Sequence, residues 1–234
     1  MKLRLAAPTR LIDLADIEDL KGVMIEAAQV ELGGMTPHRR VAQSAEIRAA
    51  IPALSSLAAG IGDLQVRNRG TLGGSVANND PAADYPAALL GLAATIRTST
   101  REIGADEFFM GLFETALEDD ELIVSIRFPK PKRAAYVKFR APGSRYALVG
   151  ILVAQTDAGA RVAVTGAGPG VYRERQMEAA LSDTFRPEAL DGIEVSAAGL
   201  NADMHGSAEY RAHLVGVLAR RATAAALANG SWRA

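Results

Sequence analysis

Short apolar runs separated by polar residues fill the first half of the chain and predict a mixture of strands and helices. Residues 22–33 hold two β-favouring runs on either side of Ala27-Ala28, which predicts a hairpin. Thr36 and Pro37 follow as a predicted N-cap and first helical residue. Further predicted elements are a helix at 45–59 bent at Pro52, a helix at 82–94 introduced by Asp80-Pro81, a strand at 95–99, a short helix at 105–113 and a strand at 121–128.

The segment "PKPKR" at 129–133 interrupts this pattern with two prolines and three cations, which predicts a linker. It divides the chain into predicted domains at 1–129 and 130–234. Beyond it, the apolar pattern predicts strands at 134–140, 146–156 and 160–168, then helices at 172–183, 186–200 and 207–229, the last closed by Gly230. Helices mixed with antiparallel strands, without regular strand–helix alternation, indicate an α+β fold with a three-stranded antiparallel sheet in the second domain.

Composition narrows the class of protein. The 26 basic and 27 acidic residues give a net charge of −1, which provides no general attraction for nucleic acid or an anionic membrane. Cysteine is absent, so this chain cannot itself hold a cysteine-ligated iron–sulfur cluster, and its three histidines lack metal-ligand spacing. No apolar run approaches about 20 residues, and the start lacks a signal-peptide pattern. We therefore expect a cytoplasmic enzyme, or a subunit of one.

The stretch "GTLGGSVANNDPAAD" at 70–84 is the strongest candidate for chemistry. Its glycines allow backbone N–H groups to approach an anion at the entry to a helix, and Thr71 and Ser75 add hydroxyl donors. It matches neither a P-loop nor the G-x-G-x-x-G turn of dinucleotide-binding folds. A ligand-binding loop and a purely structural turn both remain open from the residues alone.

Three further polar residues have alternative interpretations. Asp84 either accepts hydrogen bonds from a ligand or complements the positive end of its helix. Lys138 either faces a phosphate or is an exposed strand lysine. His38 is expected to be a surface or capping group in the first turn of a helix. No nucleophile–base pair and no carboxylate dyad emerges, so a cofactor is expected to supply any redox chemistry.

The segment "IGDLQVRNRGTLGGSVANNDPAADYPAALLGL" at 61–92 closely resembles the signature of the FAD-binding (medium) subunits of the molybdenum hydroxylases, the carbon monoxide dehydrogenase and xanthine dehydrogenase family. The resemblance continues in order through "LGGMTPHRRVAQS", "DELIVSIRFPKP", "YVKFRAPGSRYALVGILVA" and "SAEYRAHLVGVLARRA", and covers essentially the whole chain. It implies an α+β flavoprotein with FAD as cofactor.

The resemblance also implies roles for individual positions. Asp84 corresponds to a family aspartate that contacts FAD, Ile123 to an aliphatic residue that packs on it, and Lys138 and Tyr146 to polar contacts of the second domain. Ser75 stands where many relatives have asparagine, another hydrogen-bond donor. The loop that contacts FAD corresponds to Thr71, Leu72, Gly73, Gly74 and Ser75.

The sequence departs from the family at its start. Relatives begin with a further subdomain that carries a second glycine-rich loop of the form Ala-Gly-Gly-x-Ser, and this sequence has none. Met1 to Leu5 resemble an internal point of the family pattern. A start assigned too late, a shortened piece and a naturally truncated paralogue all remain open.

The function implied by the resemblance is that of an oxidoreductase subunit. Electrons would leave a molybdopterin centre in a large partner subunit, cross two [2Fe–2S] clusters in a small one, reach FAD in this chain and pass to an external acceptor. The alternative is a truncated paralogue with a structural or assembly role that binds no flavin. A stand-alone flavin oxidoreductase is disfavoured because no substrate-site acid or base emerges.

Overall fold

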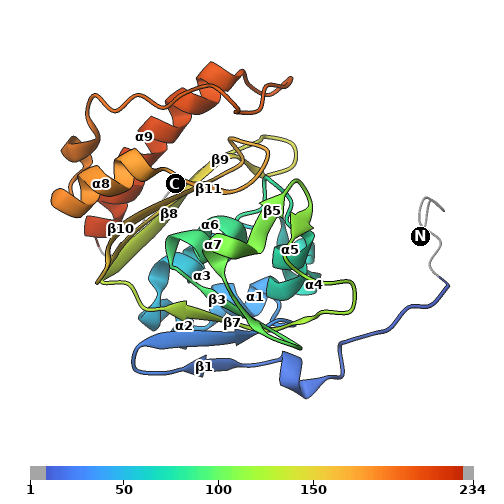
Figure 1. The fold of residues 1–234 in the computed structure, drawn as a ribbon. Helices are drawn as coiled ribbons and strands as arrows, with labels where there is room; N and C mark the ends of the chain where they lie inside the picture. Colours follow the sequence, from blue (N-terminus) through green and yellow to red (C-terminus); the bar gives the residue numbers. More distant parts are fainter. Residues whose placement is uncertain (1–8, 229–234) are drawn as a thin grey trace.

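A computed structural model describes residues 9–228 of the chain and has an α+β fold, as the sequence predicts (Figure 1). Two antiparallel sheets lie on either side of a group of helices. The larger sheet has the strand order β1-β2-β7-β3-β4. Its strands are β1 (Val23–Ile25), β2 (Gln29–Gly33), β3 (Thr95–Thr98), β4 (Glu102–Gly104) and β7 (Ile123–Pro129).

The second sheet has four strands in the order β11-β10-β9-β8, one more than the three predicted. Residues 130–132 of the "PKPKR" segment join it to the larger sheet. A separate two-stranded hairpin, β5 (Phe109–Gly111) and β6 (Glu114–Thr115), stands beside both. The strands of the second sheet are β8 (Arg133–Arg140), β9 (Ala147–Thr156), β10 (Gly159–Thr165) and β11 (Tyr172–Arg173).

Helices fill the space between the sheets and cover the outer face of the smaller one (Figure 1). In the region between the sheets lie α1 (His38–Gln43), α2 (Ala45–Ala50), α3 (Pro52–Ala59), α4 (Leu64–Arg69), α5 (Leu72–Asn78), α6 (Tyr85–Gly91) and α7 (Ala105–Phe108). On the outer face lie α8 (Arg175–Asp183) and α9 (Ala208–Leu227), and two short 3-10 helices occur at Glu18–Leu20 and Pro187–Leu190.

The apolar pattern of β9 follows from its place between two cores. Leu152 and Ala154 belong to the core shared with the larger sheet and α6, whereas Ile151 and Val153 belong to the core under α8 and α9. A strand that is buried on both faces needs a continuous apolar run rather than alternation. The first core crosses the linker through Tyr136 of β8, so the two parts of the chain are packed directly together.

Most predicted elements are present, with shifted bounds. The hairpin at 22–33 is confirmed, with Val23 opposite Leu32. The predicted helix at 45–59 is broken rather than bent, because Pro52 starts α3 and Ile51 before it has the non-helical angles φ −140° and ψ 80°. The short helix at 105–113 ends at Phe108, where β5 begins. The helix predicted from residue 207 is α9, with Ser207 as its N-cap, and the predicted closing residue Gly230 lies outside the described residues.

Four local predictions are wrong. Thr36 does not cap α1, because its hydroxyl donates to the Gly22 carbonyl and Pro37 occupies the N-cap position. Asp80 starts a turn rather than a helix, and accepts from the Ala82 N–H. Tyr172 and Arg173 form β11, so the helix predicted at 172–183 begins at Arg175. The helix predicted at 186–200 is reduced to Pro187–Leu190, because Gly192 and Gly199 have the positive φ values of 77° and 80°.

Candidate functional site

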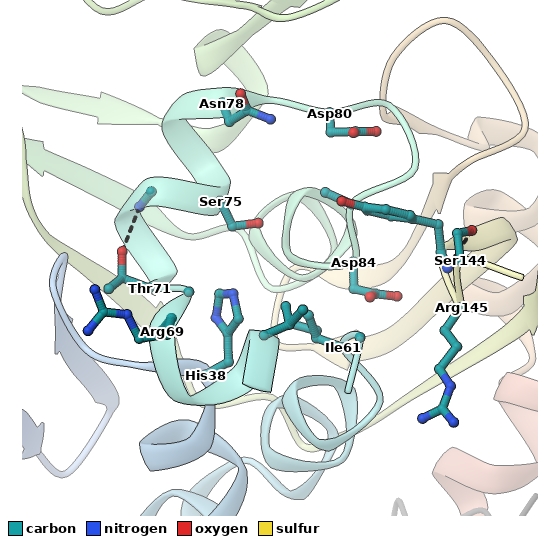
Figure 2. A pocket seen from close by; sticks show the side chains of 16 residues that line it. His38, Ile61, Arg69, Thr71, Ser75, Asn78, Asp80, Asp84, Ser144 and Arg145 are labelled. Carbon is teal, nitrogen blue, oxygen red and sulfur yellow. Dashed lines mark hydrogen bonds between the residues drawn. The ribbon is translucent and has the colours of Figure 1, made fainter. Parts of the chain in front are cut away.

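A cavity of about 510 Å³ opens where α1, α4 and α5 meet the loop between β8 and β9 (Figure 2). Arg69 and Arg145 lie on opposite sides of it, and His38, Ser75 and Asp84 lie between them (Figure 2). The wall therefore combines two arginines, two carboxylates and several hydroxyls with the bare backbone of glycines 62, 70 and 74. Such a mixed lining suits a large polar organic ligand.

The glycine-rich stretch is itself a helix, not the loop before one as expected. Thr71 is the N-cap of α5, and its hydroxyl accepts a hydrogen bond from the Gly74 N–H at 3.2 Å. The next N–H groups are also engaged: Leu72 donates to Thr36, Gly73 to Gly34, and Ser75 to Thr71. Because these amides have partners within the chain, they do not form the free anion cradle that the sequence suggested.

The adjacent glycines Gly73 and Gly74 have different structural roles. A Cβ on Gly73 would stand 2.8 Å from the Gly34 carbonyl oxygen, so this glycine allows two backbone segments to pack against each other. A Cβ on Gly74 would meet only the Thr71 hydroxyl, at 2.9 Å, and Gly74 lines the cavity. Gly73 is therefore required by the fold, and Gly74 keeps space open in the pocket.

Of the other predicted FAD-contacting residues, some line the cavity and some are buried in the core. Thr71 and Ser75 line the cavity with Gly74. Leu72 is fully buried in the core, which leaves its side chain no access to the pocket. Ile123 is also buried, in β7 opposite Thr98, and it does not line the cavity.

Asp84 forms the centre of a buried polar group that joins both halves of the chain. Its carboxylate accepts a hydrogen bond from the Tyr136 hydroxyl and forms a 2.8 Å ion pair with the Lys138 ammonium. The side chains of Asp84 and Lys138 are each only 4% exposed. Asp84 stands at the N-cap position of α6, so its charge lies at the positive end of that helix, but its hydrogen bonds go to β8 and not to the helix. Lys138 is not the exposed strand lysine of the other alternative.

Burial and charge oppose each other at this group. Burial raises the pKa of the Asp84 carboxyl above its usual range, while the Lys138 ammonium and the hydrogen bonds to it favour the charged form. Burial and the neighbouring Asp84 together raise the pKa of the Tyr136 hydroxyl well above its usual value. Tyr136 therefore stays a neutral donor, and Asp84 is fixed in orientation by two donors on β8.

The loop between β8 and β9 closes one side of the pocket. Ser144, Arg145 and Tyr146 line the cavity from this loop, and Tyr146 is 50% exposed. Arg145 has a positive φ of 62°, an uncommon conformation for a residue with a side chain, and its N–H donates to Ala141. The loop therefore places Tyr146 and Arg145 at the opening of the pocket.

Several pocket residues were missed or misplaced by sequence reasoning. His38 was expected at the surface, yet it is 4% exposed and lines the cavity. Arg69, Asn78, Asp80 and Arg145 also line it without having been singled out. Arg69 immediately precedes the glycine-rich stretch at 70–84, and Asn78 and Asp80 lie within it, so proximity to that motif was an available signal. Arg145 and His38 reach the pocket through tertiary structure and gave no such signal.

Within residues 9–228, no three histidine, aspartate or glutamate side chains are grouped closely enough to hold a metal ion. Across the same span, no helix has the length and apolar character needed to cross a membrane.

Comparison with known families and proteins gives consistent matches over the whole chain. The profile of the FAD binding domain in molybdopterin dehydrogenase matches residues 1–131, and that of the CO dehydrogenase flavoprotein C-terminal domain matches residues 134–226. The carbon monoxide dehydrogenase medium chain of Hydrogenophaga pseudoflava is 33% identical over 97% of this chain and 85% of its own length. The nicotine 6-hydroxylase medium subunit of Paenarthrobacter nicotinovorans is 33% identical over 94% of this chain and 83% of its own length.

Solved structures match the fold as well. A carbon monoxide dehydrogenase structure from Hydrogenophaga pseudoflava superimposes with a TM-score of 0.86, covering 99% of this chain and 86% of that one at 33% identity. Quinoline 2-oxidoreductase from Pseudomonas putida 86 gives a TM-score of 0.84 at 26% identity, covering 99% of this chain and 86% of that one.

Proposed function

This chain belongs to the family of FAD-binding medium subunits of the molybdenum hydroxylases, and we propose that it holds FAD in the pocket beside α5 and passes electrons from a partner subunit to an external acceptor. FAD supplies the redox chemistry, since it accepts electrons from one centre and releases them to another. The residues of this chain bind the cofactor, orient it and set the charge around it.

The observation that carries this proposal is the buried Asp84–Lys138 pair at the wall of a polar cavity. Removing two charges from water is costly, and a buried ion pair adds little net stability compared with apolar residues. A carboxylate that lines the pocket and is held by two donors instead gives a ligand a fixed hydrogen-bond acceptor. The desolvation free energy of the pair is therefore explained by a role of Asp84 in accepting a hydrogen bond from a bound cofactor.

The other lining residues fit the chemistry of a flavin dinucleotide. Thr71 and Ser75 present hydroxyls, Gly74 leaves room beside them, and Tyr146 offers an aromatic ring at the opening. Arg69 and Arg145 provide positive charge suited to the pyrophosphate. Leu72, Gly73 and Ile123 have a supporting part in this proposal, because they fix α5 and β7 within the core.

The proposed partners are a molybdopterin-binding large subunit and a small subunit with [2Fe–2S] clusters. Relatives named as medium chains of carbon monoxide dehydrogenase support this arrangement. This chain has no cysteine, so cysteine-ligated clusters would have to lie on another subunit. A cytoplasmic location remains part of the proposal, as does the division into domains at residue 129.

The alternative is an assembly subunit that keeps the fold and binds no flavin. The visible absorption spectrum of the purified complex, before and after addition of FAD, separates the two. We expect flavin bands that are bleached by dithionite and restored by an added quinone acceptor. A complex that shows no flavin bands after incubation with excess FAD and removal of the unbound FAD would support the assembly role.

A further inference from the structure

His38 is a buried side chain of the pocket to which neither the family motif nor the proposed site gives a role. It begins α1, where its N–H donates to the Gly70 carbonyl at 3.0 Å. The side chain is buried, yet it lines the cavity together with Ser75 and Asp84. Figure 2 shows the ring rising from α1 toward Ser75 on α5.

The chain makes specific room for this ring. A Cβ on Gly70 would stand 2.6 Å from His38 Nε2, so only a glycine at position 70 leaves the imidazole in place. On its other side the ring packs against Tyr85, with ring centroids 5.3 Å apart and planes tilted by 51°. His38 is therefore held firmly from two sides.

The ring is not fully hydrogen-bonded. Within residues 9–228, neither the buried His38 Nδ1 nor the hydroxyl of the adjacent Tyr85 has a hydrogen-bond partner. Buried polar atoms in folded proteins almost always have hydrogen-bond partners, so an imidazole without one needs an explanation. Because the His38 side chain lines the cavity, a ligand bound there can supply a hydrogen-bond partner to the ring. The lining residues Thr71 and Ser75 do not supply the missing partner.

The ring is neutral at physiological pH. Burial, helped by the nearby Arg67 guanidinium, lowers its pKa from 6.5 to about 4. A neutral imidazole offers one N–H donor and one acceptor nitrogen, so it suits an uncharged polar group. Phosphate groups are better served by Arg69 and Arg145, which line the same cavity and carry permanent charge.

We infer that His38 is a flavin-binding residue that forms a hydrogen bond with the uncharged part of the cofactor, its isoalloxazine ring or ribityl chain, and not with the pyrophosphate. The inference rests on the proposed function. It assigns the recognition of the neutral part of FAD to His38 and that of the charged part to the arginines of the same cavity.

The test compares two variants in the full complex after its flavin has been removed. His38→Phe keeps a packed ring but has no nitrogen, whereas His38→Gln keeps a donor and an acceptor. Dissociation constants for FAD and for riboflavin, which lacks the phosphates, are measured by flavin fluorescence. We expect His38→Phe to weaken binding of both flavins by the same factor, about three- to tenfold, and His38→Gln to recover most of the loss.

Other results would overturn the inference. Unchanged affinity in His38→Phe would show that the ring makes no hydrogen bond to flavin. A loss confined to FAD would point to a phosphate-related role. A larger loss in His38→Gln than in His38→Phe would point to a packing role. If His38→Phe does not fold, as judged by thermal melting without flavin, His38→Met replaces it as the variant without nitrogen. A wild-type complex that binds neither flavin would refute the proposed function itself, whereas normal wild-type binding with an insensitive variant refutes only the role of His38.

Discussion

Removing one partner of the buried Asp84–Lys138 pair should destabilise the protein far more than removing both. In Asp84→Asn, the Lys138 ammonium stays buried without a counter-charge, and in Lys138→Met the Asp84 carboxylate keeps only the Tyr136 hydroxyl. Breaking a pair this buried costs about 3–5 kcal/mol, whereas replacing both members is often nearly neutral. For a chain of this size, each single substitution corresponds to a fall in Tm of roughly 6–20 °C.

The assay is a double-mutant cycle measured by urea unfolding and thermal melting of the flavin-free protein. We expect the double variant, Asp84→Asn with Lys138→Met, to lie within about 1 kcal/mol of wild type, so that the cycle gives a coupling energy of several kcal/mol. The folded double variant should still fail to bind FAD, because the carboxylate is gone. Single substitutions that cost less than about 1 kcal/mol each would refute the reasoning, because they would mean that water reaches the pair.

Three further outcomes follow from local geometry. Gly73→Ala should lower the Tm much more than Gly74→Ala, because its Cβ would clash with the Gly34 backbone, 2.8 Å from the carbonyl oxygen, whereas a Cβ at position 74 meets only the Thr71 side chain; equal melting curves would contradict this. The Arg101 guanidinium, together with the hydroxyls of Thr98 and Thr100, holds the pKa of Glu121 well below its usual range near 4.5. This stabilisation is present above that range and lost as the pH falls below it, so urea midpoints at pH 7 and pH 4 should differ less in Glu121→Gln than in wild type. Asp106 accepts from Arg161 and Arg173 across the two parts of the chain, so Asp106→Asn should cost about 1 kcal/mol in urea unfolding, and an effect that does not shrink at high salt would argue against an electrostatic cause.

Elements with a strong local pattern were predictable from the sequence. The hairpin at 22–33, the long apolar strand β9 and the capped helix α9 each follow from residues that are neighbours along the chain. The prediction of a helix at 186–200 was wrong because the apolar spacing of this segment did not reveal that Gly192 and Gly199 adopt positive φ values. Local propensity is a weak guide where tertiary packing decides the backbone.

The sequence indicated a segment that lines the main cavity, but not the geometry of that cavity. The family resemblance singled out Asp84 and Lys138, which lie 54 positions apart, but no sequence pattern indicated that they form a buried pair. The glycines of α5 were noticed for a ligand, yet Gly73 is explained by a contact with Gly34 that only the folded chain contains. His38 was misjudged for the same reason, since its burial depends on Gly70 and Tyr85.

The most direct test of the central claim, that FAD occupies the pocket beside α5, is the flavin content of two glycine variants purified with their partner subunits. Gly74→Val places a side chain into the cavity, whereas Gly104→Val adds one where a Cβ meets nothing within 4 Å. The account predicts that the Gly104 variant retains the flavin content of wild type and that the Gly74 variant loses nearly all of it while remaining folded by circular dichroism. A Gly74→Val protein with wild-type flavin content would contradict the claim.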